Sequence, residues 1–221
     1  VVVPASVLVE GTNTIAVEVH QNAAASADLS FDARLSAVRD GDQPPPPPVP
    51  VDVVARGARW RYRDGGSEPP AAWNQVGFDA SGWPEAPALF GREEGGEATV
   101  LAPGTGPRWF RRTFAVADAD TVTGLRLDLI ADDGAVAYLN GVEVVRDNVA
   151  AGPITATTLA ATYRTGAAER VVRSFTVPRT ALVDGVNVLA VRLVQASGSS
   201  DASFDASLTA TGAVVDTPAP R

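Results

Sequence analysis

The chain has 221 residues, 45% of them hydrophobic, which is enough for one or two packed domains, and a formal net charge of −8. Nucleic-acid binding needs clustered positive charge to displace counterions, so this acidic balance argues against nucleic acid and against anionic membranes. The absence of cysteine excludes disulfides and thiolate metal sites, and no apolar run approaches the roughly 18 residues of a membrane span, so we expect no membrane insertion.

An internal repeat is the clearest feature of the sequence. Val3 to Gln21 reads VPASVLVEGTNTIAVEVHQ, Val177 to Gln195 reads VPRTALVDGVNVLAVRLVQ, and the tetrapeptide SFDA follows each copy, at 30–33 and 203–206. Similarity at a nearly constant offset indicates two copies of one structural unit. Because the upstream part of the first copy is absent, we expect residues 1–40 to be the C-terminal strands of a truncated copy.

Two strands are predicted in the truncated copy. Residues 13–20 alternate Ile15, Val17 and Val19 with other side chains, and residues 29–35 alternate in the same way. Alternation with period two is typical of a strand with one buried face. Unpaired strand edges expose backbone donors and acceptors, so these strands should pair with a separate chain carrying the missing portion, with a neighbouring molecule or with an edge of the complete copy.

A proline-rich segment follows, and residues 41–56 are predicted to form a linker. The run QPPPPPVP at 43–50 is poor in backbone donors and has φ fixed near about −65°, which favours polyproline II and a semi-rigid spacer of roughly 25 Å. Proline-rich ligands of SH3-type domains look similar, but a position between two copies of one module favours the spacer.

The complete copy is expected to span residues 57–213, with a tail at 214–221. RWRYR at 59–63, WFRRTFAV at 109–116 and the alternating leucines of 125–129 are predicted strands. Asp132-Asp133-Gly134 is a predicted turn, Asn140-Gly141 suits a type I′ hairpin, and PRTALVDG at 178–185 has room for one short helical turn. Many short strands with little helical periodicity indicate an all-β fold, an antiparallel β-sandwich of the jelly-roll type.

Four motifs in this order resemble the galactose-binding-like jelly roll. They are WNQVGFDASGWPEAP at 73–87, WFRRTFAV at 109–116, DDGAVAYLNGVEV at 132–144 and LVDGVNVLAVRL at 182–193. The chain is similar in these motifs to the sugar-binding domain of β-galactosidase/β-glucuronidase-type glycosidases and to accessory modules of secreted bacterial hydrolases. The resemblance implies a β-sandwich attached to something larger, often extracellular and glycan-related, and it does not imply catalysis.

The residues themselves give little support to an enzyme. The single histidine, His20, lies in the truncated copy, and Val194 takes its place in the complete one. A catalytic triad needs a base next to its nucleophile, and the carboxylate pair Glu93-Glu94 lies in a glycine-rich loop that looks solvated. We therefore expect no enzymatic activity.

A structural calcium ion is a second hypothesis. Calcium prefers six to eight oxygen ligands in tight loops, and Asp79, Asp132 and Asp205 all fall near predicted turns. The resemblance adds weight, because galactose-binding-like modules often hold one calcium ion. The alternative is structural, since Asp79 in FDASGW is also suited to an Asx-turn, and the aspartates of SFDA are suited to capping strand ends.

Sugar binding needs an aromatic platform and a few directed polar groups. Trp73 lies in a predicted loop, and Trp109 lies on the strand face opposite Phe110 and Phe114, so these two tryptophans are the candidates. Arg111 and Asp133 are their candidate polar partners. The alternative for each is packing against a loop.

Together these features favour a non-catalytic module of the extracellular space or cell surface. It would bind a polysaccharide or cell-surface glycan, or keep a catalytic partner near one, beside other modules of the same polypeptide, because linked modules raise the effective concentration at a repetitive polymer. The alternative is a purely structural stalk or surface-fibre module without a ligand site.

Overall fold

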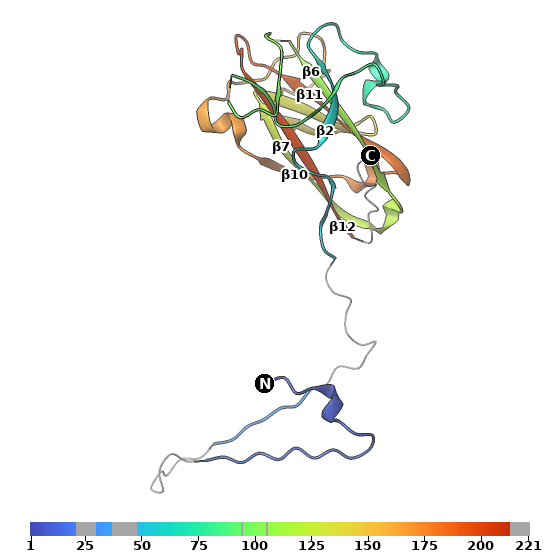
Figure 1. The fold of residues 1–221 in the computed structure, drawn as a ribbon, viewed down its shortest axis with the longest axis vertical. Coiled ribbons are helices and arrows are strands. Elements are labelled where there is room, and N and C mark those ends of the chain that lie inside the picture. The colour runs from blue at the N-terminus through green and yellow to red at the C-terminus, as the bar shows by residue number, and fades with distance from the viewer. Residues whose placement is uncertain (21–29, 37–47, 94, 105, 213–221) are drawn as a thin grey trace. The chain divides into compact units, whose positions relative to one another are not determined.

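The computed structural model describes residues 1–20, 30–36, 48–93, 95–104 and 106–212 (Figure 1). The chain divides into two compact units, Val1–Pro46 and Pro47–Arg221. Among the described residues, every strand lies in the second unit, and the helical elements are short 3-10 turns. The prediction of an all-β fold is therefore confirmed.

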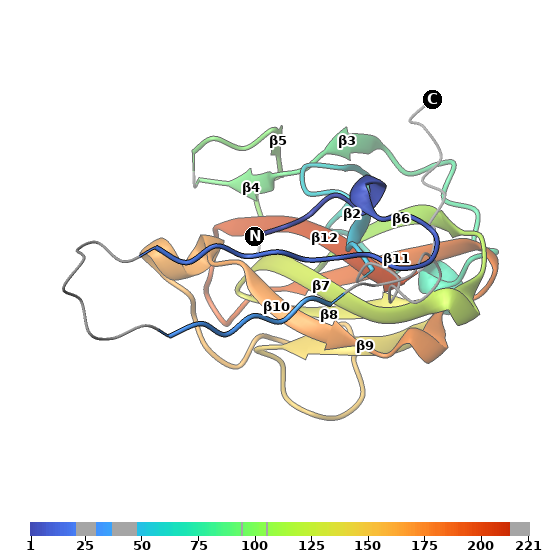
Figure 2. The same ribbon diagram turned by 90° about the horizontal axis from the view of Figure 1, so that it is seen from below.

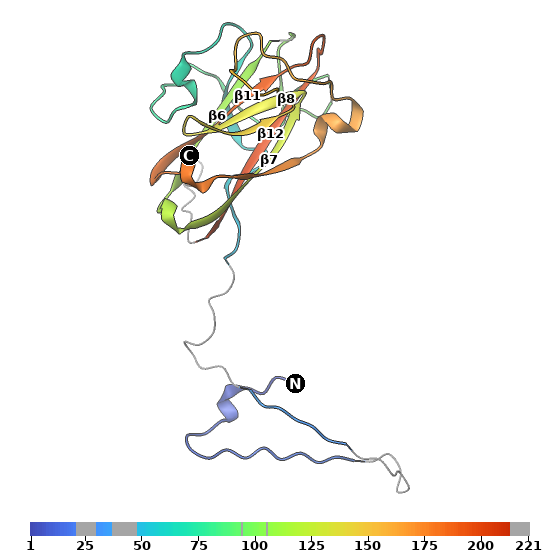
Figure 3. The ribbon, with the colours of Figure 1, turned by 180° about the vertical axis from the view of Figure 1, so that it is seen from behind.

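The second unit is a sandwich of two six-stranded sheets (Figures 1 and 3). Sheet A has the order β10 (Arg173–Val177), β7 (Val122–Asp132), β12 (Ala202–Gly212), β4 (Phe90–Arg92) and β5 (Thr99–Val100), with β1 (Val51–Val54) also pairing with β12. Sheet B has the order β3 (Glu85–Pro87), β2 (Arg59–Asp64), β6 (Arg108–Val116), β11 (Gly185–Val194), β8 (Gly134–Leu139) and β9 (Val142–Asp147). The 3-10 turns are η1 (Ala5–Val7), η2 (Ala71–Asn74), η3 (Ala119–Thr121), η4 (Gly166–Arg170) and η5 (Arg179–Ala181).

The core lies between the two sheets and follows the alternation of the sequence. Leu125, Leu127 and Leu129 of β7 are buried, as the period-two pattern of that segment predicts. Aromatic rings fill the centre, where Phe110 of sheet B stacks on Phe204 of sheet A with 3.9 Å between ring centroids. Figure 2 shows the two layers from below. The sandwich is therefore held together by facing apolar side chains from both sheets.

The two predicted turns of the central segment have different roles. Asn140 and Gly141 both have positive φ, 53° and 87°, and join the antiparallel strands β8 and β9 as a type I′ turn does. The turn at Asp132-Asp133-Gly134 instead carries the chain from β7 in sheet A to β8 in sheet B. This turn is a crossover between the layers.

The sandwich begins earlier than the sequence indicates. β1 lies within residues 41–56, the segment predicted as a linker, yet it pairs with β12, and Val53 and Val54 are buried. Two apolar side chains that gain burial against the core explain this pairing. The prolines at 43–47 and the predicted tail at 214–221 lie outside the described residues.

The first unit differs from the prediction. Residues 13–20 and 30–35 run without a strand assignment, and all the described side chains there are exposed. The predicted strands are thus not formed as paired strands among the described residues, because a strand needs a hydrogen-bonded neighbour and none of the described residues supplies one. The 3-10 turn η1, which precedes residues 13–20, is formed.

Asn187 is a buried residue of β11 that links the segment after η5 to the β8–β9 turn. Its Oδ1 accepts hydrogen bonds from the Val183 backbone N–H at 2.9 Å and from Asn140 Nδ2 at 2.7 Å, and its Nδ2 donates to the carbonyls of Val183 at 2.7 Å and Gly185 at 3.1 Å. These bonds satisfy the donors and acceptors of the buried Asn187 side chain.

Replacing Asn187 with alanine should lower the free energy of unfolding by about 1–3 kcal/mol, because partly buried donors and acceptors would lose their partners. Urea denaturation measures this change. Asn13→Ala is the matched control, since Asn13 makes the same local bonds, to Val9 and Gly11, on an exposed segment. We expect no change in sandwich stability for Asn13→Ala, and equal effects of the two substitutions would contradict the role of Asn187.

Candidate functional site

A groove rich in arginine lies beside β1, β2 and β6. Its volume is about 960 Å³, and its lining includes five arginines, Arg56, Arg59, Arg61, Arg111 and Arg112, and three carboxylates, Asp52, Asp79 and Glu85. We call it the arginine groove. On a chain with a formal net charge of −8, it is a local concentration of positive charge.

The alternation of RWRYR places Arg59 and Arg61 of β2 in the groove. Trp60 is fully buried in the core and Tyr62 packs against it, so Arg59 and Arg61 take the opposite face. Arg61 lies directly across from Arg111 on β6. Like charges in facing positions repel, so the arrangement needs anionic or carbonyl partners.

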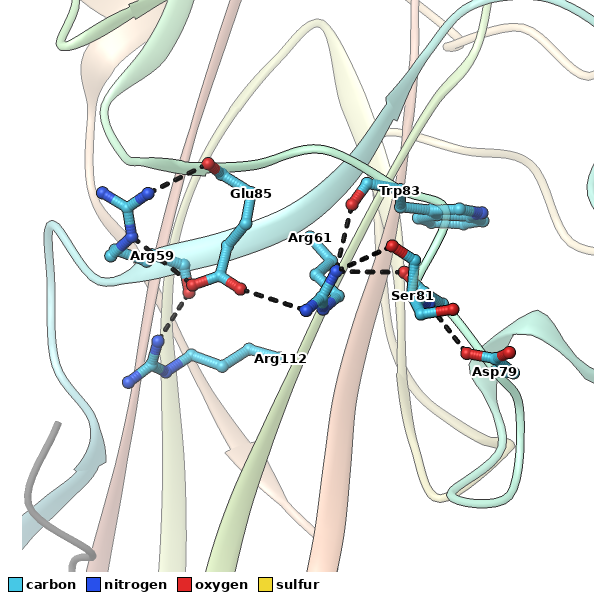
Figure 4. A network of polar contacts seen from close by, with 8 residues as sticks. Arg59, Arg61, Asp79, Ser81, Trp83, Glu85 and Arg112 are labelled. Carbon is cyan, nitrogen blue, oxygen red and sulfur yellow. Dashed lines mark hydrogen bonds and ion pairs between the residues drawn. The ribbon is translucent and has the colours of Figure 1, made fainter. Parts of the chain in front are cut away.

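Glu85 is the anionic partner at the centre of the groove (Figure 4). Its Oε1 lies 3.4 Å from Arg59 Nε and its Oε2 lies 3.6 Å from Arg61 Nη2. The Glu85 side chain is 41% exposed, and both distances are longer than the roughly 2.8 Å of a tight charge-assisted bond. One solvated carboxylate thus bridges two guanidinium groups loosely, at a place that a carboxylate of a ligand can also occupy.

Arg61 holds the loop that borders the groove. Its Nη1 donates to the carbonyls of Ala80 and Ser81, both at 3.3 Å, and of Trp83 at 3.1 Å (Figure 4). The Ser81 backbone N–H donates to Asp79 Oδ1 at 2.8 Å and holds the pKa of Asp79 below its ordinary value. The loop is therefore organised before any ligand binds.

Two further arginines join the groove to the structure below it. Arg111 donates to the carbonyls of Phe78 at 3.0 Å and Gln75 at 2.9 Å, and Arg112 donates from Nη1 to the Arg59 carbonyl. Burial lowers the pKa of both guanidinium groups, and for Arg111 the nearby charge of Arg61 lowers it further. Arginine keeps its proton through such shifts, so the groove stays cationic.

The structure brings three of the four predicted sugar-binding residues together, but beneath the surface. Trp109 does lie opposite Phe110 and Phe114, yet it is fully buried, and it packs with the buried Trp73 in one cluster. Arg111 is also buried. The η2 segment that carries Trp73 covers this face of sheet B, which corresponds to the alternative of packing against a loop.

The fourth predicted residue, Asp133, lies elsewhere and is fully buried. Its oxygens accept hydrogen bonds from the backbone N–H groups of Arg164 at 2.7 Å and Ala196 at 2.8 Å. Arg59, Arg61 and Glu85, which line the groove, were not predicted as site residues. Trp83, whose carbonyl accepts from Arg61, is the one tryptophan of the four that is not buried, and its position between Gly82 and Pro84 was the available signal for a loop.

The three predicted calcium ligands have different surroundings. Asp79 forms the Asx-turn with Ser81 described above, and Asp205 accepts hydrogen bonds from the Gly57 backbone N–H at 3.2 and 3.1 Å. Asp132 is fully buried, and neither of its oxygens has a hydrogen-bond partner among the described residues. In the part of the chain that the structure describes, no three His, Cys, Asp or Glu side chains form a group suited to a metal ion.

The single histidine, His20, is exposed in the first unit. Its Nε2 lies 3.2 Å from Glu18 Oε1. No helix among the described residues is long and apolar enough to cross a membrane.

Comparison with known proteins supports the fold. No family model and no curated protein matches the chain. A β-glucuronidase from Bacteroides uniformis matches with a TM-score of 0.50 and 19% identity over 73% of this chain and 18% of that one. A β-glucuronidase from an uncultured Clostridium sp. (TM-score 0.48, 15% identity, 82% and 31% of the two chains) and a glycosyl hydrolase family 2 member from Bacteroides cellulosilyticus (0.47, 14%, 74% and 21%) also match.

The likeness to the Bacteroides uniformis structure confirms the predicted resemblance at the level of the fold. This chain spans less than a third of the length of each of the three solved chains. The sandwich therefore shares its fold with a portion of the Bacteroides uniformis β-glucuronidase.

Proposed function

We propose that the chain is a non-catalytic accessory module of an extracellular or cell-surface protein, and that it binds an acidic polysaccharide in the arginine groove. The observation that carries this proposal is the placement of Glu85 between Arg59 and Arg61 at 3.4 and 3.6 Å. The carboxylate group of a uronic acid residue has the same charge and shape as the carboxylate group of Glu85. The fold that the chain shares with part of a β-glucuronidase is consistent with a glycan-related role.

The binding step is an exchange of one carboxylate for another. A uronate carboxylate enters from solvent, Glu85 swings away, and Arg59 and Arg61 donate charge-assisted hydrogen bonds to the ligand. Such bonds contribute about 1.5–3 kcal/mol each, and the displaced Glu85 contact offsets part of that. One groove therefore binds weakly, and several modules on one polypeptide would multiply the affinity for a repetitive polymer.

Arg59→Gln should weaken binding to a polyuronate such as polygalacturonate by about tenfold, because it removes one charge-assisted bond. Glu85→Gln should strengthen binding several-fold, because it removes the competing carboxylate. Affinity electrophoresis at low salt, with neutral dextran in parallel, measures both effects. The opposite signs separate a specific groove from general attraction.

Arg126→Gln is the matched control, since Arg126 is an exposed arginine of β7 outside the groove that pairs with Asp128 at 2.9 Å. It makes the same charge change as Arg59→Gln. If Arg126→Gln weakens retention as much as Arg59→Gln, the groove is not the site. If the unmodified chain is not retained on acidic or neutral polysaccharides, the alternative of a structural stalk module takes the place of this proposal.

A further inference from the structure

The exposed apolar residues of the first unit correspond one by one to core residues of the sandwich. The alignment of the two copies pairs Ile15, Val17 and Val19 with Leu189, Val191 and Leu193, and pairs Phe31 and Leu35 with Phe204 and Leu208. The first five side chains are all exposed, and their five counterparts are all buried. The first unit thus carries the apolar pattern of β11 and β12 without the core that this pattern serves.

The turn in front of β11 is also reproduced in the first unit. η1 follows Pro4 as η5 follows Pro178, and Gly11 and Gly185 have positive φ of 94° and 79°. Asn13 makes hydrogen bonds of 2.9, 2.8 and 3.2 Å to Val9 and Gly11, and Asn187 makes bonds of 2.9, 2.7 and 3.1 Å to the equivalent Val183 and Gly185. The local conformation is the same, whereas the neighbouring strands are present only for the second copy.

β11 and β12 occupy central positions in the sandwich. β11 pairs with β6 on one edge and with β8 on the other, in sheet B. β12 pairs with β7 on one edge and with β4 and β1 on the other, in sheet A. A segment equivalent to this pair therefore has unpaired backbone groups along four edges, as well as an apolar face for each sheet.

We propose that residues 13–20 and 30–36 are the two central strands of a second sandwich, and that their partner is a module body of this same fold that carries the equivalents of β1 to β10. The first segment inserts between a β6-like and a β8-like strand, and the second inserts beside a β7-like strand. This inference rests on the part of the proposed function that places several modules on one polypeptide, and it is independent of glycan binding.

The partner body is expected to differ from the body seen here in the surroundings of Arg192. Arg192 of β11 is buried, its Nη1 forms an ion pair with Glu68 at 2.5 Å, and its guanidinium lies over the Trp109 ring. Glu18 takes the place of Arg192 in the first copy, which reverses the charge. The partner therefore carries a cationic or hydrogen-bond-donating side chain where this body has Glu68.

A chimeric chain tests the inference. Residues 51–177 are placed directly before Pro4 of the full chain, with Glu18→Arg to match Glu68, so that residues 4–36 follow a body as 178–209 do in the sandwich. Hydrogen–deuterium exchange of the amides of residues 13–19 is compared with that in the unmodified chain. We expect exchange to slow by about 100-fold or more, because these amides become central ladder donors.

Two controls bound the result. The same chimera with Ile15→Asp and Val17→Asp should return these amides to fast exchange, and a chimera that keeps 178–211 after the added body shows that such a body folds with its own strands. The inference is wrong if residues 13–19 exchange as fast in the test chimera as in the unmodified chain. It is also wrong if the added body is folded when residues 178–211 follow it but unfolded when residues 4–36 follow it. Neither outcome involves a polysaccharide, so failure here is distinct from failure of the arginine groove.

Discussion

Replacing Phe204 with alanine is expected to lower the free energy of unfolding of the sandwich by about 3–5 kcal/mol, the usual cost of truncating a buried aromatic residue. Phe204 is fully buried, stacks on Phe110 at 3.9 Å and meets Trp60 edge-on at 5.2 Å. Its removal leaves a cavity between the two sheets that rigid neighbouring rings fill poorly. Urea denaturation followed by tryptophan fluorescence measures the loss.

The repeat supplies a matched control for this prediction. Phe31 is the counterpart of Phe204 in the same tetrapeptide SFDA, but its side chain is 57% exposed. Phe31→Ala should change sandwich stability by less than about 0.5 kcal/mol. A cost below 1 kcal/mol for Phe204→Ala, or similar costs for both substitutions, would contradict the assignment of the core to the second copy.

The core could be predicted from the sequence because alternation alone decides the face of a strand. The alternating leucines of 125–129 were predicted to lie on one face of a strand, and Leu125, Leu127 and Leu129 are all buried. The Asn140-Gly141 turn was equally accessible, because few residues tolerate positive φ at two successive positions. Both kinds of prediction depend only on residues close together in the chain.

The candidate site could not be predicted, because it depends on contacts between distant segments. The face of Trp109 was assigned correctly, but its exposure depends on whether η2 returns to cover sheet B, and the sequence carries no local signal for that. In the same way, Arg61 meets Arg111 and Glu85 only through the register of β2 with β6 and β3. The alternation of the first copy predicted two strands that are not formed among the described residues, because strand formation also needs a neighbouring strand.

Asp132 gives the sandwich an expected pH dependence. Burial, together with the negative charges of Asp133, Asp201 and Glu169, raises the pKa of this carboxyl from 3.8 to about 8, and Arg173 lies near enough to interact with it. In the unfolded chain the carboxyl is in water, where its pKa is ordinary. The folded chain therefore holds a proton that the unfolded chain releases between pH 3.8 and about 8.

The sign of the effect follows from this difference in bound protons. Below pH 3.8 the carboxyl is protonated in both states, and this group takes nothing from the stability of the sandwich. As the pH rises toward 8, the unfolded state gives up its proton first, so the free energy of unfolding falls, by at most about 1.4 kcal/mol per pH unit. Above pH 8 the charge is buried in the folded state as well, and the loss is complete.

Asp132→Asn should therefore stabilise the sandwich at pH 8 and should flatten the decline of stability between pH 5 and 8, by on the order of a few kcal/mol. An amide has nearly the shape of the protonated carboxyl and carries no charge to desolvate. Denaturant midpoints of both proteins, measured at intervals across this range, give the two curves.

Asp205→Asn is the informative contrast, because burial raises the pKa of Asp205 as well. Its carboxylate, however, accepts from the Gly57 backbone N–H and lies 3.7 Å from Arg56 Nη1. These partners lower the pKa against the effect of burial, so the charged form of Asp205 costs less in the folded state, and Asp205→Asn should change stability at pH 8 by less than Asp132→Asn does. If Asp132→Asn destabilised the sandwich at pH 8, the buried carboxylate would have to be a stabilised anion with a partner of its own.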